Sequence, residues 1–177
     1  MSDEISPQGE TFPVPGNDSA WVVLHTRPRC EKKAADYCDR NAIPKYLPLR
    51  KKVHRYGSRE REFSSPLFPG YLFCIVTAVQ KSEVRQNRYV ANLLEVLDQA
   101  TLVDQLRQID RALTVGDVIE VMPYLETGRR VRVTSGPLKG LEGMVLRIKG
   151  KTRVIINVDM IQQSVAVEVD NALLSPA

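Results

Sequence analysis

The chain has 177 residues, 43% of them hydrophobic and 26% charged, so it is long enough for one medium domain or two small ones with modest cores. Its formal net charge is only +4, and its three cysteines form an odd number without C-x-x-C spacing, which argues against a disulfide framework or a zinc site. The sequence has no run of about 18 apolar residues and no basic start followed by an apolar stretch, so we expect a cytoplasmic protein without a membrane segment.

The positive charge is concentrated in one part of the chain. Counting Lys and Arg against Asp and Glu gives −4 for residues 1–20, +7 for 21–63, −3 for 64–128 and +4 for 129–177. A local excess of this kind is typical of a protein that contacts nucleic acid along one side.

Residues 1–20 are acidic and contain several prolines, so we expect a disordered tail. Residues 21–25 predict a buried strand. After it, Cys30, Ala34 and Cys38 recur at the spacing of one helix face. We interpret these two cysteines and Cys74 as packing residues, because no activating base lies beside them.

The next elements alternate between strands and helices. Residues 46–49 predict a short strand, and residues 50–63 a basic hairpin arm around Tyr56, Gly57 and Ser58. Further elements are a central strand at 69–76, a helix at 78–86, a strand at 89–97 and a last helix that Thr101 and Asp104 would cap. This order suits a four-stranded antiparallel sheet with helices packed on it.

The C-terminal part predicts a small β-barrel. Strand candidates lie at residues 131–134, 144–149, 153–158 and 165–169, and their many β-branched residues favour strands. Gly136, Gly140 and Gly143 lie in the turn between the first two. We therefore expect an α+β fold: a tail at 1–20, a domain at 21–112 whose four-stranded antiparallel sheet is flanked by helices, a linker at 113–127 and a barrel at 128–177.

Catalysis has little support in the sequence. Only His25 and His54 are present, and neither paired carboxylates nor a nucleophile motif stands in a suitable setting. We expect no enzyme, no cofactor and no metal.

Two segments carry a family resemblance. Residues 128–169 resemble the KOW motif, and the strand at Trp21 followed by Phe68, Pro69, Gly70 and Tyr71 resembles the N-terminal domain of NusG. In this order the two motifs cover nearly everything after residue 20, which implies a transcription elongation or antitermination factor. Residues 26–33 and 65–69 look closer to specialised paralogues of the RfaH and UpxY type, which implies an operon-specific antiterminator.

The resemblance implies a polymerase-binding face. In proteins similar to NusG, the positions matching Tyr71 and Phe73 line an apolar pocket for the clamp helices of the RNA polymerase largest subunit. The residues alone leave an alternative, in which both faces of this strand pack within their own domain. The resulting set of candidate polymerase contacts is Phe68, Pro69, Gly70, Tyr71 and Phe73.

The resemblance also implies contact with DNA. Arg27 and Lys33 match positions that touch the exposed non-template strand in RfaH-like paralogues. The basic arm could reach a phosphate backbone, with Tyr56 as a stacking platform, although a charge run is also typical of a solvated face. The candidate DNA contacts are Arg27, Lys33, Arg50, Lys51, Lys52 and Arg55.

The barrel matches its relatives only in part. In NusG an aromatic and a basic residue bind a small-subunit ribosomal protein and the termination factor Rho, and the matching positions here are Ile161 and Gln163. Ile161 keeps the apolar character of the first position, but Gln163 lacks the positive charge of the second. The ribosomal protein therefore stays a candidate partner, whereas binding of Rho is not expected. Two alternatives stay open, a general NusG-type pausing and termination factor and a ribosome-associated KOW protein that binds RNA.

Some RfaH-like paralogues hold this domain as a helical hairpin against the polymerase-binding face. Here β-branched residues dominate the module, and four glycines would each cost a helix about 1 kcal/mol relative to alanine. We therefore predict a barrel on a flexible linker.

Overall fold

The computed structural model describes residues 12–56, 59–115 and 119–177, with residues 52–56 and 59 described by their backbone only. The chain divides into two compact units. Among the described residues, unit 1 comprises Phe12, 98–115 and 119–177, and unit 2 comprises 13–56 and 59–97. The predicted α+β class is confirmed.

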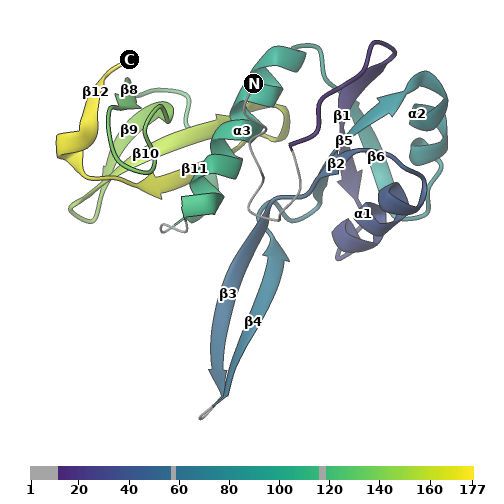
Figure 1. Cartoon of the computed structure of the whole chain (residues 1–177), viewed down its shortest axis with the longest axis horizontal. Coiled ribbons are helices and arrows are strands. Elements are labelled where there is room, and N and C mark those ends of the chain that lie inside the picture. The colour runs from purple at the N-terminus through teal and green to yellow at the C-terminus, as the bar shows by residue number, and fades with distance from the viewer. Residues whose placement is uncertain (1–11, 57–58, 116–118) are drawn as a thin grey trace. The chain divides into compact units, whose positions relative to one another are not determined.

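Unit 2 contains the predicted four-stranded antiparallel sheet (Figure 1), with strand order β2-β5-β1-β6. Its strands are β1 (Ser19–Thr26), β2 (Lys45–Tyr46), β5 (Tyr71–Thr77) and β6 (Val90–Glu95). The two central strands, β1 and β5, are aligned along most of their length, from Ser19 opposite Thr77 to His25 opposite Tyr71. This register fixes which residues share a face of the sheet.

Two helices cover one face of this sheet. They are α1 (Glu31–Arg40) and α2 (Ala78–Arg85), and Thr77 and Gln80 cap α2 reciprocally. The core beneath them contains apolar residues of both sheet and helices, among them Val22, Leu24, Ala34, Cys38, Leu72, Cys74 and Val84. The predicted packing role of Cys38 and Cys74 agrees with this position.

The opposite face of the sheet is also apolar. Alternation along the strands puts Trp21 and Val23 of β1 on it, opposite Ile75 and Phe73 of β5. All four side chains are at most 2% exposed. Residues of both α1 and α2 belong to the other core.

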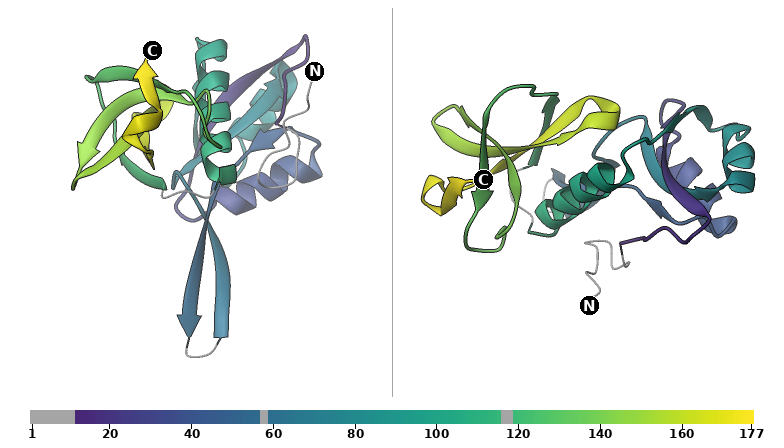
Figure 2. Two further views of the ribbon diagram at one scale, coloured as in Figure 1. Left: turned by 60° about the vertical axis from the view of Figure 1, so that its left-hand side comes forward. Right: turned by 90° about the horizontal axis from the view of Figure 1, so that it is seen from above.

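A long hairpin forms the predicted arm. It consists of β3 (Leu49–Tyr56) and β4 (Arg59–Pro66), paired from Leu49 opposite Pro66 to Tyr56 opposite Arg59. Both Figure 1 and Figure 2 show it projecting beyond the sheet of unit 2. Its base is tied to the unit, because Leu67 N donates to Pro48 O at 2.8 Å and Lys32 Nζ donates to Ser64 O at 2.7 Å.

Unit 1 contains the predicted barrel, formed by a six-stranded antiparallel sheet that curls on itself (Figure 2) with strand order β12-β8-β9-β10-β11-β7. The strands are β7 (Ile119–Pro123), β8 (Arg129–Val133), β9 (Glu142–Ile148), β10 (Lys151–Val158), β11 (Gln163–Glu168) and β12 (Leu174–Pro176). Short 3-10 turns, η1 (Asp159–Ile161) and η2 (Asn171–Leu173), precede the last two strands. The prediction of strands over a helical hairpin is confirmed for this unit.

The last helix, α3 (Gln99–Val115), packs on the barrel. Gln105 and Asp159 are joined by two hydrogen bonds, from Gln105 Nε2 to Asp159 Oδ2 at 2.8 Å and from Asp159 N to Gln105 Oε1 at 3.2 Å. Glu142 N donates to Gln108 Oε1 at 2.8 Å. The helix is therefore fixed to both η1 and β9.

The two compact units group α3 and β7 differently from the domains predicted from the sequence, which stay a prediction. Compactness divides the chain between Leu97 and Asp98, so α3 belongs to unit 1, whereas the sequence predicts it in the domain at residues 21–112. The segment predicted as a linker, 113–127, contains the last residues of α3 and the whole of β7. Strand β7 pairs with β11 and so belongs to the barrel sheet. Ile119 and Val121 alternate as in a strand, but Pro123 and Gly128 suggest a break, so the sequence favours both a strand and a linker in this segment.

The start of the described chain and the start of α3 bear on two further predictions. Residues 1–11 of the predicted tail lie outside the described residues, but Phe12 is buried and the Arg107 guanidinium lies 5.6 Å from its ring centroid. Asp98, and not Thr101, caps α3, since Asp98 accepts hydrogen bonds from Thr101 N at 3.0 Å and Thr101 Oγ1 at 2.7 Å. In the described part of the chain, no helix is both long and apolar enough to cross a membrane.

Candidate functional site

The turn that enters β5 is held by hydrogen bonds on both sides. Gly70 has φ +88°, a conformation that glycine adopts without strain. Its N–H donates to Glu31 Oε1 at 2.7 Å, and its carbonyl accepts from Thr26 N at 2.8 Å. The Glu31 side chain is nearly buried, so a charge-assisted bond connects the start of α1 to this turn.

The aromatic residues of this segment lie at two depths. Tyr71 is half-buried and stacks on the exposed His25, with ring centroids 5.3 Å apart and planes at 25°. Phe68 and Phe73 are at most 1% exposed and meet edge to face at 6.4 Å. Of the five predicted contacts, Pro69, Gly70 and Tyr71 therefore form surface, while Phe68 and Phe73 support it from the interior.

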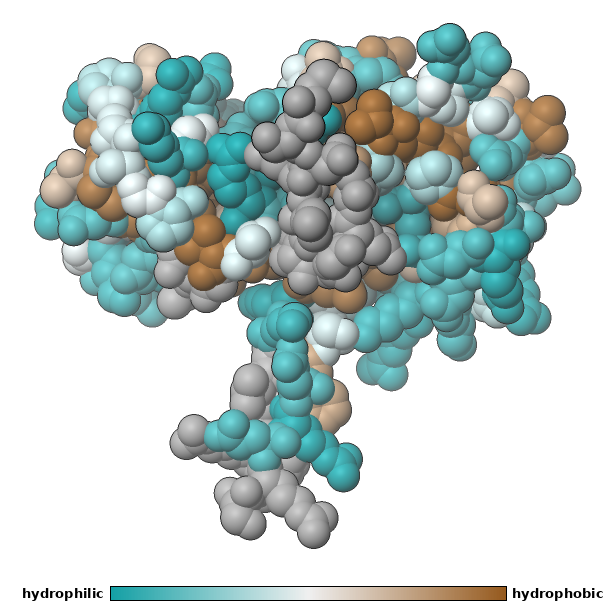
Figure 3. Space-filling view, in the orientation of Figure 1, coloured by the Kyte–Doolittle hydropathy of each residue, from teal (hydrophilic) through white to brown (hydrophobic). Residues whose placement is uncertain are grey.

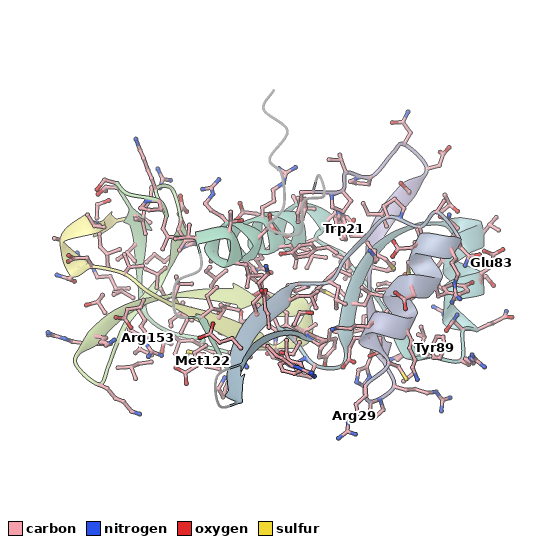
Figure 4. All side chains as sticks on the ribbon, turned by 60° about the horizontal axis from the view of Figure 1, so that its bottom comes forward. Trp21, Arg29, Glu83, Tyr89, Met122 and Arg153 are labelled. Carbon is pink, nitrogen blue, oxygen red and sulfur yellow. The ribbon has the colours of Figure 1, made fainter. Side chains whose placement is uncertain are left out.

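A second surface lies at the start of α1. Arg27 and Lys33 are both exposed, and Arg27 N donates to Tyr89 O at 2.9 Å. The Arg88 guanidinium lies 4.8 Å from the Tyr89 ring centroid and donates to its hydroxyl at 2.6 Å. Figure 4 shows Arg29 and Tyr89 at the same end of unit 2. This is a basic surface with an aromatic ring in it.

Sequence reasoning missed His25, Arg88 and Tyr89 as members of these surfaces. The adjacent pair Arg88 and Tyr89 is a local signal that could have drawn attention, because a cation beside an aromatic ring is typical of nucleic-acid contacts. His25 carries no such signal, since its stacking on Tyr71 depends on the register of β1 and β5.

The structure separates the predicted basic residues of the arm. Arg50 is half-buried at its base, and Lys51 is exposed with its Nζ 3.0 Å from Glu62 Oε1. The backbone of Lys52 and Arg55 lies in β3, and their side chains fall outside the described atoms. Lys32 connects α1 to Ser64 of β4, so the arm and the start of α1 form one continuous part of unit 2.

The predicted partner residues of the barrel offer limited surface. Ile161 is 6% exposed in η1, and Gln163 is half-buried between Val158 of β10 and Pro123 of β7. Asp159 in the same turn is held by Gln105 and by the Tyr124 hydroxyl at 2.8 Å. The hydrogen bond to the Asp159 carboxylate is the main cause that raises the pKa of Tyr124 above its ordinary value.

The cysteines are distributed between surface and core. Cys30 is half-buried just before α1, whereas Cys38 and Cys74 are buried in the first core. The hydrogen bond with the Cys38 thiol, followed by burial, raises the pKa of the Cys74 thiol well above its usual value. Within residues 12–51, 60–115 and 119–177, where side chains are described, no three His, Cys, Asp or Glu residues are grouped as a metal site.

Comparisons with known proteins agree on one family. The model described as "Transcription termination factor nusG" matches residues 19–112, and the KOW motif model matches residues 127–157. No curated protein sequence matches the chain. Among 18 matching chains of solved structures is Thermotoga maritima NusG, described for its domain interaction.

That structure is 18% identical to this chain, with a TM-score of 0.53, and the alignment covers 89% of this chain and 97% of the Thermotoga chain. At this identity the likeness supports the fold. The family assignment depends on the sequence model, which spans more than half of the 177 residues. With its N-terminal NusG domain followed by a KOW motif, the chain belongs to the NusG family of transcription elongation and termination factors.

Proposed function

We propose that this protein binds RNA polymerase through the surface of Pro69, Gly70 and Tyr71, and promotes processive elongation and antitermination at particular operons. The observation that carries the proposal is the fixed turn before β5, in a domain of the NusG family. Its contact point is the clamp-helix pair of the largest subunit. NusG-family proteins are non-enzymatic transcription factors, which supports the expectation that this chain is not an enzyme.

The turn is well suited to binding because it is preorganised. Glu31 and Thr26 hold Gly70 from both sides, and stacking on His25 orients the Tyr71 ring. A partner that packs on Tyr71 therefore orders few new torsions, which lowers the entropic cost of association. Phe68 and Phe73 act beneath the surface by fixing the strand.

Non-template DNA is the second partner of the proposal. Arg27 and Lys33 are exposed at the start of α1, beside the Arg88 and Tyr89 pair. Basic side chains contact phosphates, and the exposed Arg88 guanidinium that lies over the Tyr89 ring can itself stack on an unpaired base. Arg50, Lys51, Lys52 and Arg55, whose backbone lies in β3, are the further candidate DNA contacts of the proposal.

Two other roles are kept as second candidates. The matched family model is that of a termination factor, which favours general control of pausing and termination over action at one operon. Ile161 and Gln163 would contact a small-subunit ribosomal protein, but Ile161 must first be uncovered because it is 6% exposed. Crosslinking of this protein to transcription complexes across the genome separates the two roles. An operon-specific factor is found at few genes, and a general factor is found at most of them.

Polymerase affinity tests the main proposal. Tyr71→Ala should weaken binding of the full chain to core polymerase by about 2 kcal/mol, or roughly thirtyfold, which is the scale of an aromatic hot spot. The matched control is Tyr37→Ala, because Tyr37 is also a half-buried tyrosine of unit 2 but packs against the other core. Phe73→Ala is unsuitable, since truncation of a fully buried phenylalanine costs about 3–5 kcal/mol of stability. Wild-type affinity in a folded Tyr71→Ala variant would remove the proposal.

A further inference from the structure

Two thiols meet in the core between α1 and β5. Cys38 lies in the last turn of α1 and Cys74 in the middle of β5, and both residues are fully buried. The S–H group of Cys74 donates a hydrogen bond to Cys38 Sγ. Figure 3 shows a largely hydrophilic surface over α1, and the apolar core that contains both thiols lies beneath this helix.

A nearly buried ammonium group accompanies the two thiols. Lys45 of β2 lies directly opposite Cys74 of β5, and residues opposite one another in an antiparallel pair point to the same face of the sheet. The Lys45 side chain is 14% exposed, and its Nζ lies 3.0 Å from Oδ1 of Asp39, the residue that follows Cys38. Strand pairing on one side and this ion pair on the other therefore hold a positive charge beside both cysteines.

These neighbours make the two thiols chemically unequal. The hydrogen bond from Cys74 is the main cause that lowers the pKa of the Cys38 thiol, and the Lys45 ammonium lowers it further. Burial and the Asp39 carboxylate act in the opposite direction. The same hydrogen bond, followed by burial, raises the pKa of Cys74. Cys38 is therefore the sulfur that more readily becomes a thiolate, and Cys74 stays protonated beside it.

We propose that Cys38 and Cys74 are a redox-active pair, which hydrogen peroxide converts into an intramolecular disulfide. The Cys38 thiolate attacks one peroxide oxygen, the O–O bond breaks, and the departing hydroxide takes up the proton that Cys38 released and becomes water. The Cys74 sulfur then attacks the sulfenic acid on Cys38. The S–S bond forms, the S–O bond breaks, and the hydroxyl group leaves as a second water with the Cys74 proton. The two thiols lose two electrons, which reduce one peroxide to two waters.

The third cysteine cannot take the place of Cys74. Cys30 lies just before α1, and Cys38 lies near its end. A helical rise of about 1.5 Å per residue separates their Cα atoms by about 12 Å, which exceeds the roughly 7 Å that a disulfide tolerates. Cys30 and Cys38 therefore cannot be bridged while the helix is intact.

Peroxide needs only a small opening to reach the pair, because it is close to water in size. The turn that closes α1 contains Ala42 with φ +52°, a left-handed conformation that costs energy in a residue other than glycine. The chain is therefore strained at the end of the helix that carries Cys38, and helix ends open locally more easily than their middles.

This inference is independent of polymerase binding. Cys74 belongs to the core under α1, whereas the adjacent Phe73 points to the other face of the sheet. The test needs no polymerase, so its failure would leave the proposed function untouched.

The test uses the full chain with Cys30→Ala, in which Cys38 and Cys74 are the only thiols. The reduced protein is freed of reductant and treated with hydrogen peroxide, and its thiols are then counted in denaturant. We expect both thiols to be lost, the mass to fall by two hydrogens, and dithiothreitol to restore both. After digestion with trypsin without reductant, residues 34–40 and 62–81 should appear as one linked peptide. The midpoint of urea unfolding should rise, because the bridge restrains the unfolded chain.

A second variant tests the ammonium group. Lys45→Met in the same background removes the charge at similar side-chain length, and the bridge should form at least about fivefold more slowly because less of Cys38 is thiolate. The matched control is Lys81→Met. Lys81 is also a partly buried lysine of unit 2, and its Nζ lies 2.7 Å from Glu95 Oε1. This control should react at the rate of the parent, and circular dichroism confirms that each variant is folded.

Several results would overturn the inference. Both thiols could survive a treatment that oxidises free cysteine in the same buffer, or the bridge could join two chains. Cys38 could instead be oxidised to the sulfinic acid while Cys74 stays free, or the bridge could form only where denaturant unfolds the chain. Equal rates in Lys45→Met and Lys81→Met would also contradict it, because the cation beside the pair would then have no role.

Discussion

Substitution of Gly143 by alanine distinguishes a barrel from a helical hairpin by the sign of its effect. A Cβ atom at this position in β9 would lie 2.3 Å from Ile155 O and 2.8 Å from Val154 Cγ1. Ordinary contact begins near 3.4 Å, so β9 and β10 would have to separate by about 1 Å. Such a shift takes ladder hydrogen bonds beyond their normal length.

The magnitude follows from two costs. Overpacking costs about 1–3 kcal/mol, and each buried backbone group that loses its partner costs about 1–3 kcal/mol more. Gly143→Ala should therefore lower the free energy of unfolding of unit 1 by about 3 kcal/mol or more. In a helix the same change would be stabilising by about 1 kcal/mol.

The assay is urea unfolding of the full chain by far-UV circular dichroism, with hydrogen exchange at β9 and β10 to isolate unit 1. Gly150→Ala is the first control: a Cβ atom added there would meet no atom within 4 Å, but φ is +78°, so backbone strain of about 1–2 kcal/mol is its only cost. Gly16→Ala is the second, because its nearest contact is an ordinary 3.8 Å. An unchanged or higher stability of Gly143→Ala would refute the packing of β9 against β10 in the barrel.

Three further experiments test the turn at Gly70, the cap of α3 and the burial of the cysteines in the core under α1 and α2. Glu31→Ala should lower stability by about 1.5–3 kcal/mol in urea unfolding because Gly70 N–H loses its acceptor, whereas Glu31→Gln, which keeps an oxygen, should cost less. The assigned hydrogen bond would be contradicted if both variants lost much stability, or if neither did. Hydrogen bonds from the Thr101 backbone and side chain lower the pKa of Asp98, so its capping contribution is present above the unfolded pKa of about 3.9 and is lost as pH falls through the lower folded value. Chemical shifts during an acid titration should show this midpoint below about 3.9, and a midpoint above it would contradict the cap. Of the three thiols, only the half-buried Cys30 should react quickly with a thiol reagent in the native protein, and all three should react in denaturant.

Much of unit 2 could be predicted from sequence because its signals are local. The helix spacing from Cys30 to Cys38, for example, acts within about two turns of chain. By contrast, the role of His25 requires a strand register, which single-strand patterns leave open.

The boundary between the units was the least predictable feature. The apolar stripe of α3 shows that the helix packs on something, but not on which unit. The bonds that fix it to the barrel join Gln105 to Asp159 and Gln108 to Glu142, across long stretches of sequence. Pro123 suggests a break, so β7 was predicted as part of a linker. Its place in the barrel depends on pairing with β11, which lies far along the chain.

The depth of the aromatic residues also needed the structure. Phe68, Tyr71 and Phe73 look alike in sequence, yet only Tyr71 keeps an accessible ring. Phe68 lies before the Gly70 turn and is buried, whereas Tyr71 begins β5 and pairs with His25 at the end of the two central strands. This distinction decides which residue is a fair test of partner binding.

Single-round transcription in vitro tests the central claim most directly. Purified core polymerase elongates through a template with pause and terminator sites, with and without the full chain, Tyr71→Ala or Tyr37→Ala. With each protein present near the wild-type Kd, we predict that the wild-type chain and Tyr37→Ala change pausing and readthrough alike, and that Tyr71→Ala leaves the transcripts close to those made without the protein. A folded Tyr71→Ala that acts like the wild type, or a wild-type chain without effect on any template, would contradict the account.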